Sequence, residues 1–326
     1  MIVLMEPLAD GKAEYQVDDK TFRLYLQWST RGLSGGPVVV AENLLQELKS
    51  RTDIAWSLVT PESNFERKYS VMWVVNNLKD LVWASENKAR LGCQYLWAGP
   101  NLVVVPQEGQ EIIGHRQIDR VVVPCQWVGE VYSYLMPTIK EKLMVWPVGI
   151  DAEFWRPNTT SEKQLIVVYD KGNPELAEKI DSGLCSFGEK TVKITYGNYR
   201  KNEYKDLLEQ AKAMVWLSAT ESQGIALMEA LAMNIPVLCL KNNVWNYQSF
   251  ELQTGFRYDG ATSAPYFNEQ CGMFFEDGQD FFQKQYPAFS RNIASFTPRA
   301  YLYENNLVIG KSLTCIREEL NHISYQ

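Results

Sequence analysis

The sequence predicts an α/β protein with two doubly wound parallel sheets. The first observation is length, because 326 residues are enough for two domains of ordinary size. The second is that short apolar runs alternate with amphipathic stretches twice along the chain, which is typical of parallel sheets covered by helices. The third is a polar segment with Gly and Pro between the two halves, which is typical of a connection between domains.

In the first half, apolar runs predict strands and amphipathic stretches predict helices. The stretch VVVAENLLQELKS and the range 126–135 are the expected helices. The expected strands are the runs at 22–28, 54–59, 81–85, 101–106, 120–124 and 142–148. We therefore expect a first Rossmann-like domain over 1–148.

The second half repeats this alternation after the connection GIDAEFWRPNTTSEKQ at 149–164. Strands are expected over 164–170, 191–197, 213–218 and 236–240, and helices over 174–187, 201–212 and 223–233. Beyond Leu240 the pattern is less regular until a final amphipathic helix from about 299 to 322, with Pro298 in its first turn. We expect a second Rossmann-like domain over 149–298.

Composition excludes several classes of function. The net charge of −7 argues against nucleic-acid binding, which needs clustered cations. We expect no membrane span, because no segment is long and apolar enough, and no secretion signal at the amino terminus. The six cysteines lack the paired spacing of zinc or disulfide frameworks, so we expect buried thiols in a reducing compartment. We expect a cytoplasmic protein, and with only two histidines no histidine-based metal site.

The stretch SATESQGIALMEAL holds two carboxylates that could meet one ligand. A strand is expected to end at Ser218 and a helix to begin near Gly224. Ligands of open parallel sheets bind beyond the carboxyl ends of the strands, where Glu221 lies. Glu229 follows about two helical turns later, so its side chain should lie on the face that points back toward the loop.

The start of this expected helix adds hydrogen-bond donors. The first amides of a helix have no partner inside it, and those of Gly224, Ile225 and Ala226 suit a pyrophosphate or sugar hydroxyls. Glu229 has apolar neighbours and needs a polar partner, such as a pair of ribose hydroxyls. The spacing alone leaves open that Glu221 is an ordinary carboxylate at a helix start and Glu229 a solvated helical residue.

The segment ESQGIALMEALAMNIPVLCL at 221–240 resembles the E-x7-E segment of retaining glycosyltransferases of the GT-B fold, especially family 4. The resemblance implies that Glu221 contacts the donor sugar and Glu229 the nucleotide ribose. It also implies that the loop residues Ser222 and Gln223 bind the donor together with the amides of the following helix.

Three further segments resemble that family and extend the likeness over most of the chain. STRGLSGGPVVVAENLLQEL resembles its amino-terminal glycine loop, in which Gly35 and Gly36 would let the backbone approach the donor; a plain Gly-Gly turn is the alternative. VWPVGIDAEFWRP resembles the interdomain segment P-x-G-[IV]-D-x-x-x-F-x-P. ITYGNYRKNEYKDLLEQAKAMVWLS resembles the part where the nucleotide base stacks on backbone, here near Gly197 and Tyr199.

The sequence departs from the family at the cations that bind phosphate. Family members carry Arg and then, four residues later, Lys-Gly, whereas VVYDKGNPE holds Lys171 and Gly172 without that Arg. Lys171 is the expected cation, with Arg200 assisting from the neighbouring loop; an exposed lysine in a turn is the alternative. Because amides and Lys171 can neutralise phosphate and an Asp-x-Asp motif is missing, no metal or other cofactor is expected. The expected catalytic residues are Glu221 and Lys171.

The resemblance implies two Rossmann-like domains whose parallel sheets face a central cleft. The first would bind the acceptor and the second a UDP- or GDP-sugar, and the C-terminal helix over about 299–326 would pack back on the first. The expected activity is hexosyl transfer to an unknown glycan, protein or lipid, with retention of the anomeric configuration. A non-catalytic binding or scaffold protein of the same fold and a nucleotide-sugar epimerase are the alternatives.

Overall fold

The computed structural model describes residues 23–27, 35–59, 70–158 and 163–324, and these divide into two compact units. The first unit contains the residues up to Gly149 together with 250–252 and 312–326. The second contains 150–249 and 253–311. Most of the connecting segment expected at 149–164 therefore belongs to the second unit, where residues 159–162 lie outside the described residues.

The first unit is built on a six-stranded sheet with the order β2-β1-β3-β4-β5-β6, in which every pairing is parallel. Its strands are β1 Arg23–Gln27, β2 Ala55–Leu58, β3 Val71–Asn76, β4 Tyr95–Asn101, β5 Arg120–Val123 and β6 Leu143–Val145. Its helices are α1 Gly36–Ser50, α2 Leu78–Asn87, α3 Gln126–Leu135 and α10 Thr314–Ser324, with short 3-10 turns at Ile112–Gly114 and Pro137–Lys142.

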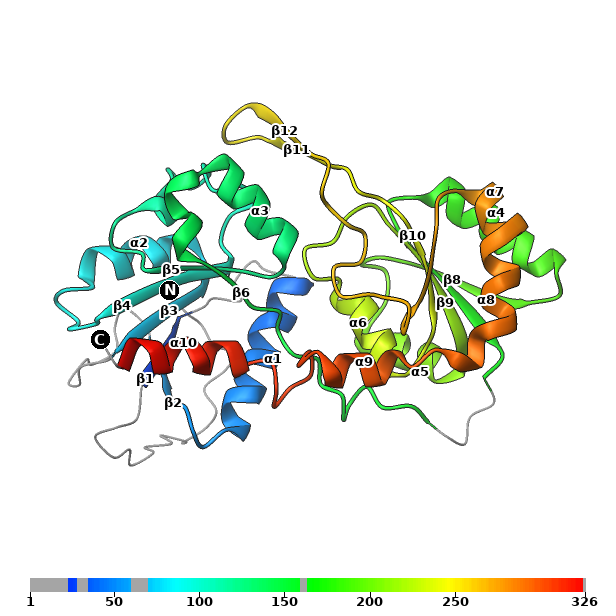
Figure 1. The fold of residues 1–326 in the computed structure, drawn as a ribbon, viewed down its shortest axis with the longest axis horizontal. Helices are drawn as coiled ribbons and strands as arrows, with labels where there is room; N and C mark the ends of the chain where they lie inside the picture. Colours follow the sequence, from blue (N-terminus) through cyan, green and yellow to red (C-terminus); the bar gives the residue numbers. More distant parts are fainter. Residues whose placement is uncertain (1–22, 28–34, 60–69, 159–162, 325–326) are drawn as a thin grey trace. The chain divides into compact units, whose positions relative to one another are not determined.

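Helices cover both faces of this sheet (Figure 1). On the face of α2 and α3, Met72 and Val74 of β3 pack with Leu81 and Tyr132 in one buried cluster. Helices α1 and α10 lie on the other face (Figure 1). The six residues of β3 are all buried, as expected for a parallel strand covered on both sides.

Two of the expected strands in this unit are wrong. Residues 81–85 lie inside α2, which is capped by the Asn77 side chain accepting from the Lys79 amide at 3.0 Å, and the run LVWAS fits either structure by periodicity alone. Residues 102–106 follow the end of β4, and the strand lies earlier, over Tyr95–Asn101. The strand β3 has no counterpart among the expected elements.

Gly99 explains why β4 is difficult to recognise. A Gly-Pro pair usually marks a turn, but here it lies within the strand. Gly99 has φ +110, and a Cβ at this position would be 2.2 Å from the carbonyl oxygen of Val122. Glycine is therefore needed because the backbone of β5 comes so close.

The second unit is built on a five-stranded parallel sheet with the order β13-β10-β9-β7-β8. The strands are β7 Leu165–Lys171, β8 Lys190–Thr195, β9 Ala211–Ser218, β10 Val237–Leu240 and β13 Gly272–Phe275. The helices are α4 Pro174–Ser186, α5 Lys201–Gln210, α6 Ile225–Ala232, α7 Gly278–Asp280, α8 Tyr286–Asn292 and α9 Pro298–Glu304; helical turns at Phe281–Gln285 and Ile293–Ser295 connect α7, α8 and α9.

Alternate residues of β7 and β9 point into two different cores. Val167 and Tyr169 pack in the core with α5, α6 and α9, whereas Ile166 and Val168 pack in the core with α4 and α8. This alternation confirms the expected doubly wound parallel sheet. An antiparallel hairpin of β11 Trp245–Ser249 and β12 Thr254–Tyr258 forms a separate two-stranded sheet.

The expected single helix over 299–322 is wrong, because the chain forms two helices there. Pro298 does begin α9, but α9 ends at Glu304 and α10 begins only at Thr314. Between them Asn306 and Gly310 have φ +58 and +93, and Val308 forms a parallel bridge with Ile150. Helix α9 belongs to the second unit and α10 to the first.

Candidate functional site

The carboxyl edge of the second sheet gathers the polar side chains of the candidate site. After β7 the chain adds β8 on one side and then β9 on the other, so the strand order reverses between β7 and β9. Lys171 ends β7, Ser218 ends β9, and the two are partners in register. Ligands of open α/β sheets bind at such a switch point. Glu221 lies at this edge too, in the loop between β9 and α6.

Lys171 and Glu221 form an ion pair at this edge. The Lys171 Nζ lies 2.8 and 2.9 Å from the two carboxylate oxygens of Glu221, and the Ser218 hydroxyl donates to Oε1 at 2.7 Å. The Lys171 side chain is 31% exposed and the Glu221 side chain 8%, so the carboxylate is shielded while the ammonium remains accessible. Lys171, for which the sequence left open an exposed lysine in a turn, is thus a partly exposed residue at the end of β7 that pairs with Glu221.

Hydrogen bonds from neighbouring loops hold the loop that carries Glu221. The Glu221 amide donates to the Thr262 carbonyl at 2.9 Å, and Asn242 Nδ2 donates to the Ala219 carbonyl at 2.6 Å. Trp216, which lies in β9, donates to the Ser263 carbonyl at 3.0 Å. The Glu221 backbone is thus fixed by two segments that follow later in the chain.

Helix α6 begins immediately after this loop, close to its expected start. Gly224 is its N-cap residue with φ +76, a left-handed conformation that favours glycine, and no side chain caps the helix. The N-cap residue therefore offers no side chain to the first amides of the helix, those of Ile225 and Ala226. Of the preceding loop residues, Ser222 is exposed and Gln223 is buried.

Glu229 is a buried carboxyl group and not a solvated helical residue. It is 8% exposed, and no described residue donates a hydrogen bond to its carboxylate. Burial raises its pKa to about 8, while the Lys201 ammonium lowers the pKa to a smaller extent. The carboxyl group is therefore mostly protonated at neutral pH, so it could both donate a hydrogen bond to a ligand hydroxyl and accept one.

A group of tyrosines lies beside Glu229. The Tyr199 and Tyr169 hydroxyls are 2.6 Å apart, and the Tyr204 hydroxyl donates to the Ala226 carbonyl at 2.8 Å. Burial raises the pKa of Tyr199 to about 12, and the charge of Glu229 contributes to this. Tyr199 therefore belongs to the surroundings of Glu229.

The other two residues expected near the nucleotide lie in the turn between β8 and α5. Gly197 has φ +83 and open space beside it. Arg200 is the N-cap residue of α5, and its amide donates to the Glu203 carboxylate at 2.9 Å. Within the described part of the chain no hydrogen bond or ion pair joins the exposed Arg200 side chain to Lys171 or Glu221.

Gly35 and Gly36 belong to the first unit, at the start of α1. Gly35 is the N-cap residue with φ +68, and Gly36 is the first helical residue, followed by Pro37. A Cβ at Gly36 would have no atom within 4 Å, so packing does not require glycine there. The preceding residues 29–34 of the expected glycine loop lie outside the described residues.

Two residues at the site are missing from the sequence-based set. Ser218 donates to Glu221, and the Tyr196 ring lies 4.5 Å from Lys171 Nζ. The signal for both is their place at the end of a predicted strand, since carboxyl ends of parallel strands share one edge.

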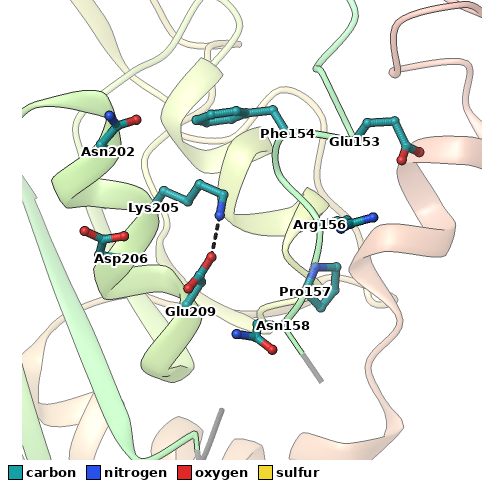
Figure 2. Close-up of a pocket in the computed structure, with 9 residues that line it drawn as sticks. All are labelled: Glu153, Phe154, Arg156, Pro157, Asn158, Asn202, Lys205, Asp206 and Glu209. Carbon is teal, nitrogen blue, oxygen red and sulfur yellow. Dashed lines mark hydrogen bonds and ion pairs between the residues drawn. The ribbon is translucent and has the colours of Figure 1, made fainter. Parts of the chain in front are cut away.

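A groove of about 970 Å³ lies elsewhere in the second unit (Figure 2). Figure 2 shows Phe154 and Arg156 of the connecting segment facing Lys205 and Glu209 of α5, which form an ion pair with each other. None of the residues proposed for donor binding lines this groove. We therefore locate the site from the convergent polar groups at the sheet edge.

Two further kinds of feature are absent from the described residues. No group of three or more His, Cys, Asp or Glu residues that could hold a metal ion occurs among them. None of the helices in that part of the chain is both long and apolar enough to cross a membrane.

No protein-family model matches the sequence, and no curated protein does. Among solved structures, HepE from Anabaena in complex with UDP is similar at 11% identity and a TM-score of 0.57, over 94% of this chain and 100% of that one. A glycosyltransferase from Rickettsia africae is similar at 11% identity and a TM-score of 0.56, over 94% and 98%. The lipopolysaccharide galactosyltransferase WaaB is similar at 8% identity and a TM-score of 0.51, over 94% and 99%. These proteins are GT-B glycosyltransferases, and at this identity the likeness shows the fold: the chain has the GT-B fold.

Proposed function

We propose that the protein is a glycosyltransferase that transfers a hexose from a UDP- or GDP-sugar to an acceptor. The observation that carries this proposal is the convergence of Lys171, Glu221 and the start of α6 at the switch point of the second sheet, with the buried Glu229 about one turn further along α6. A cation, a shielded carboxylate and the amides at a helix start match the charges and hydroxyls of a nucleotide sugar.

In this proposal each group has a separate task. Lys171 and the first amides of α6 bind the diphosphate, which gains negative charge as its bond to the anomeric carbon breaks. Glu221 accepts hydrogen bonds from the hydroxyls of the sugar and orients it. Glu229 binds the ribose hydroxyls, which would supply its missing polar partner. The acceptor hydroxyl forms the new bond to the anomeric carbon as the bond to the diphosphate breaks, and its proton passes to the departing diphosphate.

Seven further residues are assigned to donor binding by analogy with the GT-B glycosyltransferases that the sequence resembles. Gly35, Gly36, Gly197, Tyr199, Arg200, Ser222 and Gln223 are proposed to contact the donor. HepE forms complexes with UDP and with UDP-glucose, which favours a UDP-sugar. We also propose retention of configuration, phosphate neutralisation without a metal, and an end of the first domain near 148.

The cysteines support a cytoplasmic location within this proposal. All six are free; four are buried, whereas Cys185 is exposed and Cys315 is half-buried. Exposed and half-buried thiols without a disulfide suit a reducing compartment.

The test is donor hydrolysis and nucleotide binding by the purified protein. Incubation with UDP- and GDP-sugars should release the nucleoside diphosphate, and proton NMR should detect the released sugar first as the anomer of the donor. The variant Glu221→Gln should still bind UDP. Its hydrolysis of the donor, measured as the formation of UDP, should be at least about 100-fold slower, as expected for lost transition-state stabilisation. The control Glu276→Gln, in an exposed ion pair with Lys241, should behave as wild type.

Other outcomes would support other functions. UDP binding without hydrolysis or transfer to any glycan would favour the binding or scaffold protein. This alternative is considered because the segment with Lys171 lacks the Arg that the resembling family carries before it. Release of the opposite anomer would contradict retention, and conversion of the bound sugar into its epimer would favour the epimerase.

A further inference from the structure

The lysine of the candidate site has a second neighbour besides Glu221, the ring of Tyr196. The centroid of this ring is 4.5 Å from Lys171 Nζ, whereas the Glu221 oxygens are 2.8 and 2.9 Å from the same atom. A cation at this distance from a ring is attracted by the negative face of the ring. The ammonium therefore has a carboxylate and an aromatic ring as neighbours.

The backbone fixes Tyr196 in this place. The Tyr196 amide donates to the carbonyl of Asp170, the residue before Lys171, at 2.9 Å. Gly197 follows with φ +83, so the chain turns away directly after the ring. The position of the ring relative to Lys171 is thus set by the end of the β7 and β8 pairing.

Core packing does not explain this tyrosine. Tyr196 is 48% exposed and belongs to neither buried cluster of the second unit. A half-exposed aromatic ring held against a cation suggests that the ring acts on that cation.

The lysine has a reason to need such a contact. Its stem is flexible, and ordering a lysine side chain costs considerable rotamer entropy. The segment VVYDKGNPE supplies Lys171 as its only cation, so an ill-placed ammonium would leave that loop without a phosphate ligand. Two contacts, one with the carboxylate and one with the ring, restrict the ammonium more strongly than the carboxylate alone.

We propose that Tyr196 is a positioning residue of the donor site, whose ring face holds the Lys171 ammonium where it meets the diphosphate of a nucleotide sugar. This inference rests on the proposed function. The face of the ring is the active feature, and the hydroxyl group is dispensable.

The test compares Tyr196→Phe, which keeps the ring, with Tyr196→Leu, which keeps an apolar side chain without it. The control is Tyr134→Leu, which removes a tyrosine that is 77% exposed in the first unit. Calorimetry measures the affinity of each protein for UDP and for uridine, which lacks the diphosphate. The NMR signal of the reductively ¹³C-methylated Lys171, assigned by its absence in Lys171→Arg, reports on the ammonium without any nucleotide.

We expect Tyr196→Leu to weaken UDP binding about threefold to tenfold, the range of a partly exposed cation–π contact. Its uridine affinity should equal that of wild type, and its Lys171 signal should move toward that of an exposed lysine. Tyr196→Phe and Tyr134→Leu should match wild type in all three measurements.

Three results would overturn the inference. An equal loss of UDP and uridine affinity in Tyr196→Leu would mean that the ring stacks on the base. A loss in Tyr196→Phe as large as that in Tyr196→Leu would assign the effect to the hydroxyl. An unchanged Lys171 signal in Tyr196→Leu would show that the ring does not hold the ammonium. If wild type binds no nucleotide, the proposed function fails, and the Lys171 signal alone decides whether the ring positions the lysine.

Discussion

The protonation of Glu229 makes the stability of the protein depend on pH in a specific way. Burial raises its pKa from the ordinary value of 4.5 to about 8. Between these values the unfolded chain has lost the proton and the folded chain keeps it. The unfolded state therefore binds fewer protons, and stability falls as pH rises. This contribution is complete below pH 4.5 and is lost by the time pH exceeds 8.

The size of the effect follows from the width of this window. Each pH unit inside it lowers the free energy of unfolding by about 1.4 kcal/mol. From pH 5.5 to pH 7.5, Glu229 should therefore destabilise the folded protein by about 2.7 kcal/mol, as an upper figure. The variant Glu229→Gln keeps the shape of the side chain but cannot ionise, so it should lack this contribution.

Urea unfolding at several pH values between 5 and 8.5 measures the difference. The wild-type curve and the Glu229→Gln curve should converge at low pH and separate steadily toward pH 8, with the variant more stable. All other titrating groups are common to both proteins and cancel. The control Glu276→Gln changes an exposed carboxylate and should run parallel to wild type. Parallel curves for wild type and Glu229→Gln would refute a protonated, buried Glu229.

Three further substitutions test the fold. Glu47→Ala should destabilise the protein by about 2–4 kcal/mol, because the buried carboxylate accepts from the Ser312 hydroxyl at 2.5 Å and the Leu313 amide at 3.0 Å; calorimetry should show a lower Tm, and an unchanged Tm would contradict this. Gly99→Ala should lower the yield of folded protein, because its Cβ would be 2.2 Å from a backbone oxygen and space for it requires strand movement. Arg299→Met should also lower Tm, since this guanidinium donates to three backbone carbonyls, whereas Arg291→Met should leave it unchanged.

The second unit could be predicted from the sequence better than the first. Strands such as β7 and β9 consist of apolar runs bounded by clear helical stretches, and β9 begins at Ala211, directly after α5. In the first unit, the run at 81–85 fits helix and strand equally, and β4 contains a Gly-Pro pair that imitates a turn. Both ambiguities are settled by tertiary contacts, namely the packing of Leu81 and Ala84 of α2 in the core that also holds Met72 and Val74 of β3 and the close approach of Gly99 to β5.

The break between α9 and α10 had a local signal that the amphipathic pattern concealed. The pair Asn305-Asn306 and Gly310 are residue types that adopt left-handed conformations, and Asn306 and Gly310 do so here. The local sequence does not reveal which residue pairs with this connection, because Val308 pairs with Ile150, far away in the chain.

For the candidate site, the sequence predicts where the residues lie along the chain, but not which residues contact one another. The positions of Glu221, Gly224 and Glu229 at a strand–loop–helix junction follow from periodicity. The ion pair of Lys171 with Glu221 depends on strand order, which brings the ends of β7 and β9 together although 47 residues separate Lys171 from Ser218. The burial of Glu229 depends on packing and is visible only in the structure.

A thermal-shift screen tests the central claim, that Glu221 and Glu229 belong to a nucleotide-sugar site, most directly. Purified protein is compared with Glu229→Ala in the presence of UDP, GDP, ADP and CMP and their sugar conjugates at millimolar concentration. A ligand of the folded state raises Tm according to its affinity and concentration. We predict a rise in Tm with UDP or GDP that is absent in a folded Glu229→Ala protein. No rise with any nucleotide, or an equal rise in both proteins, would contradict the assignment.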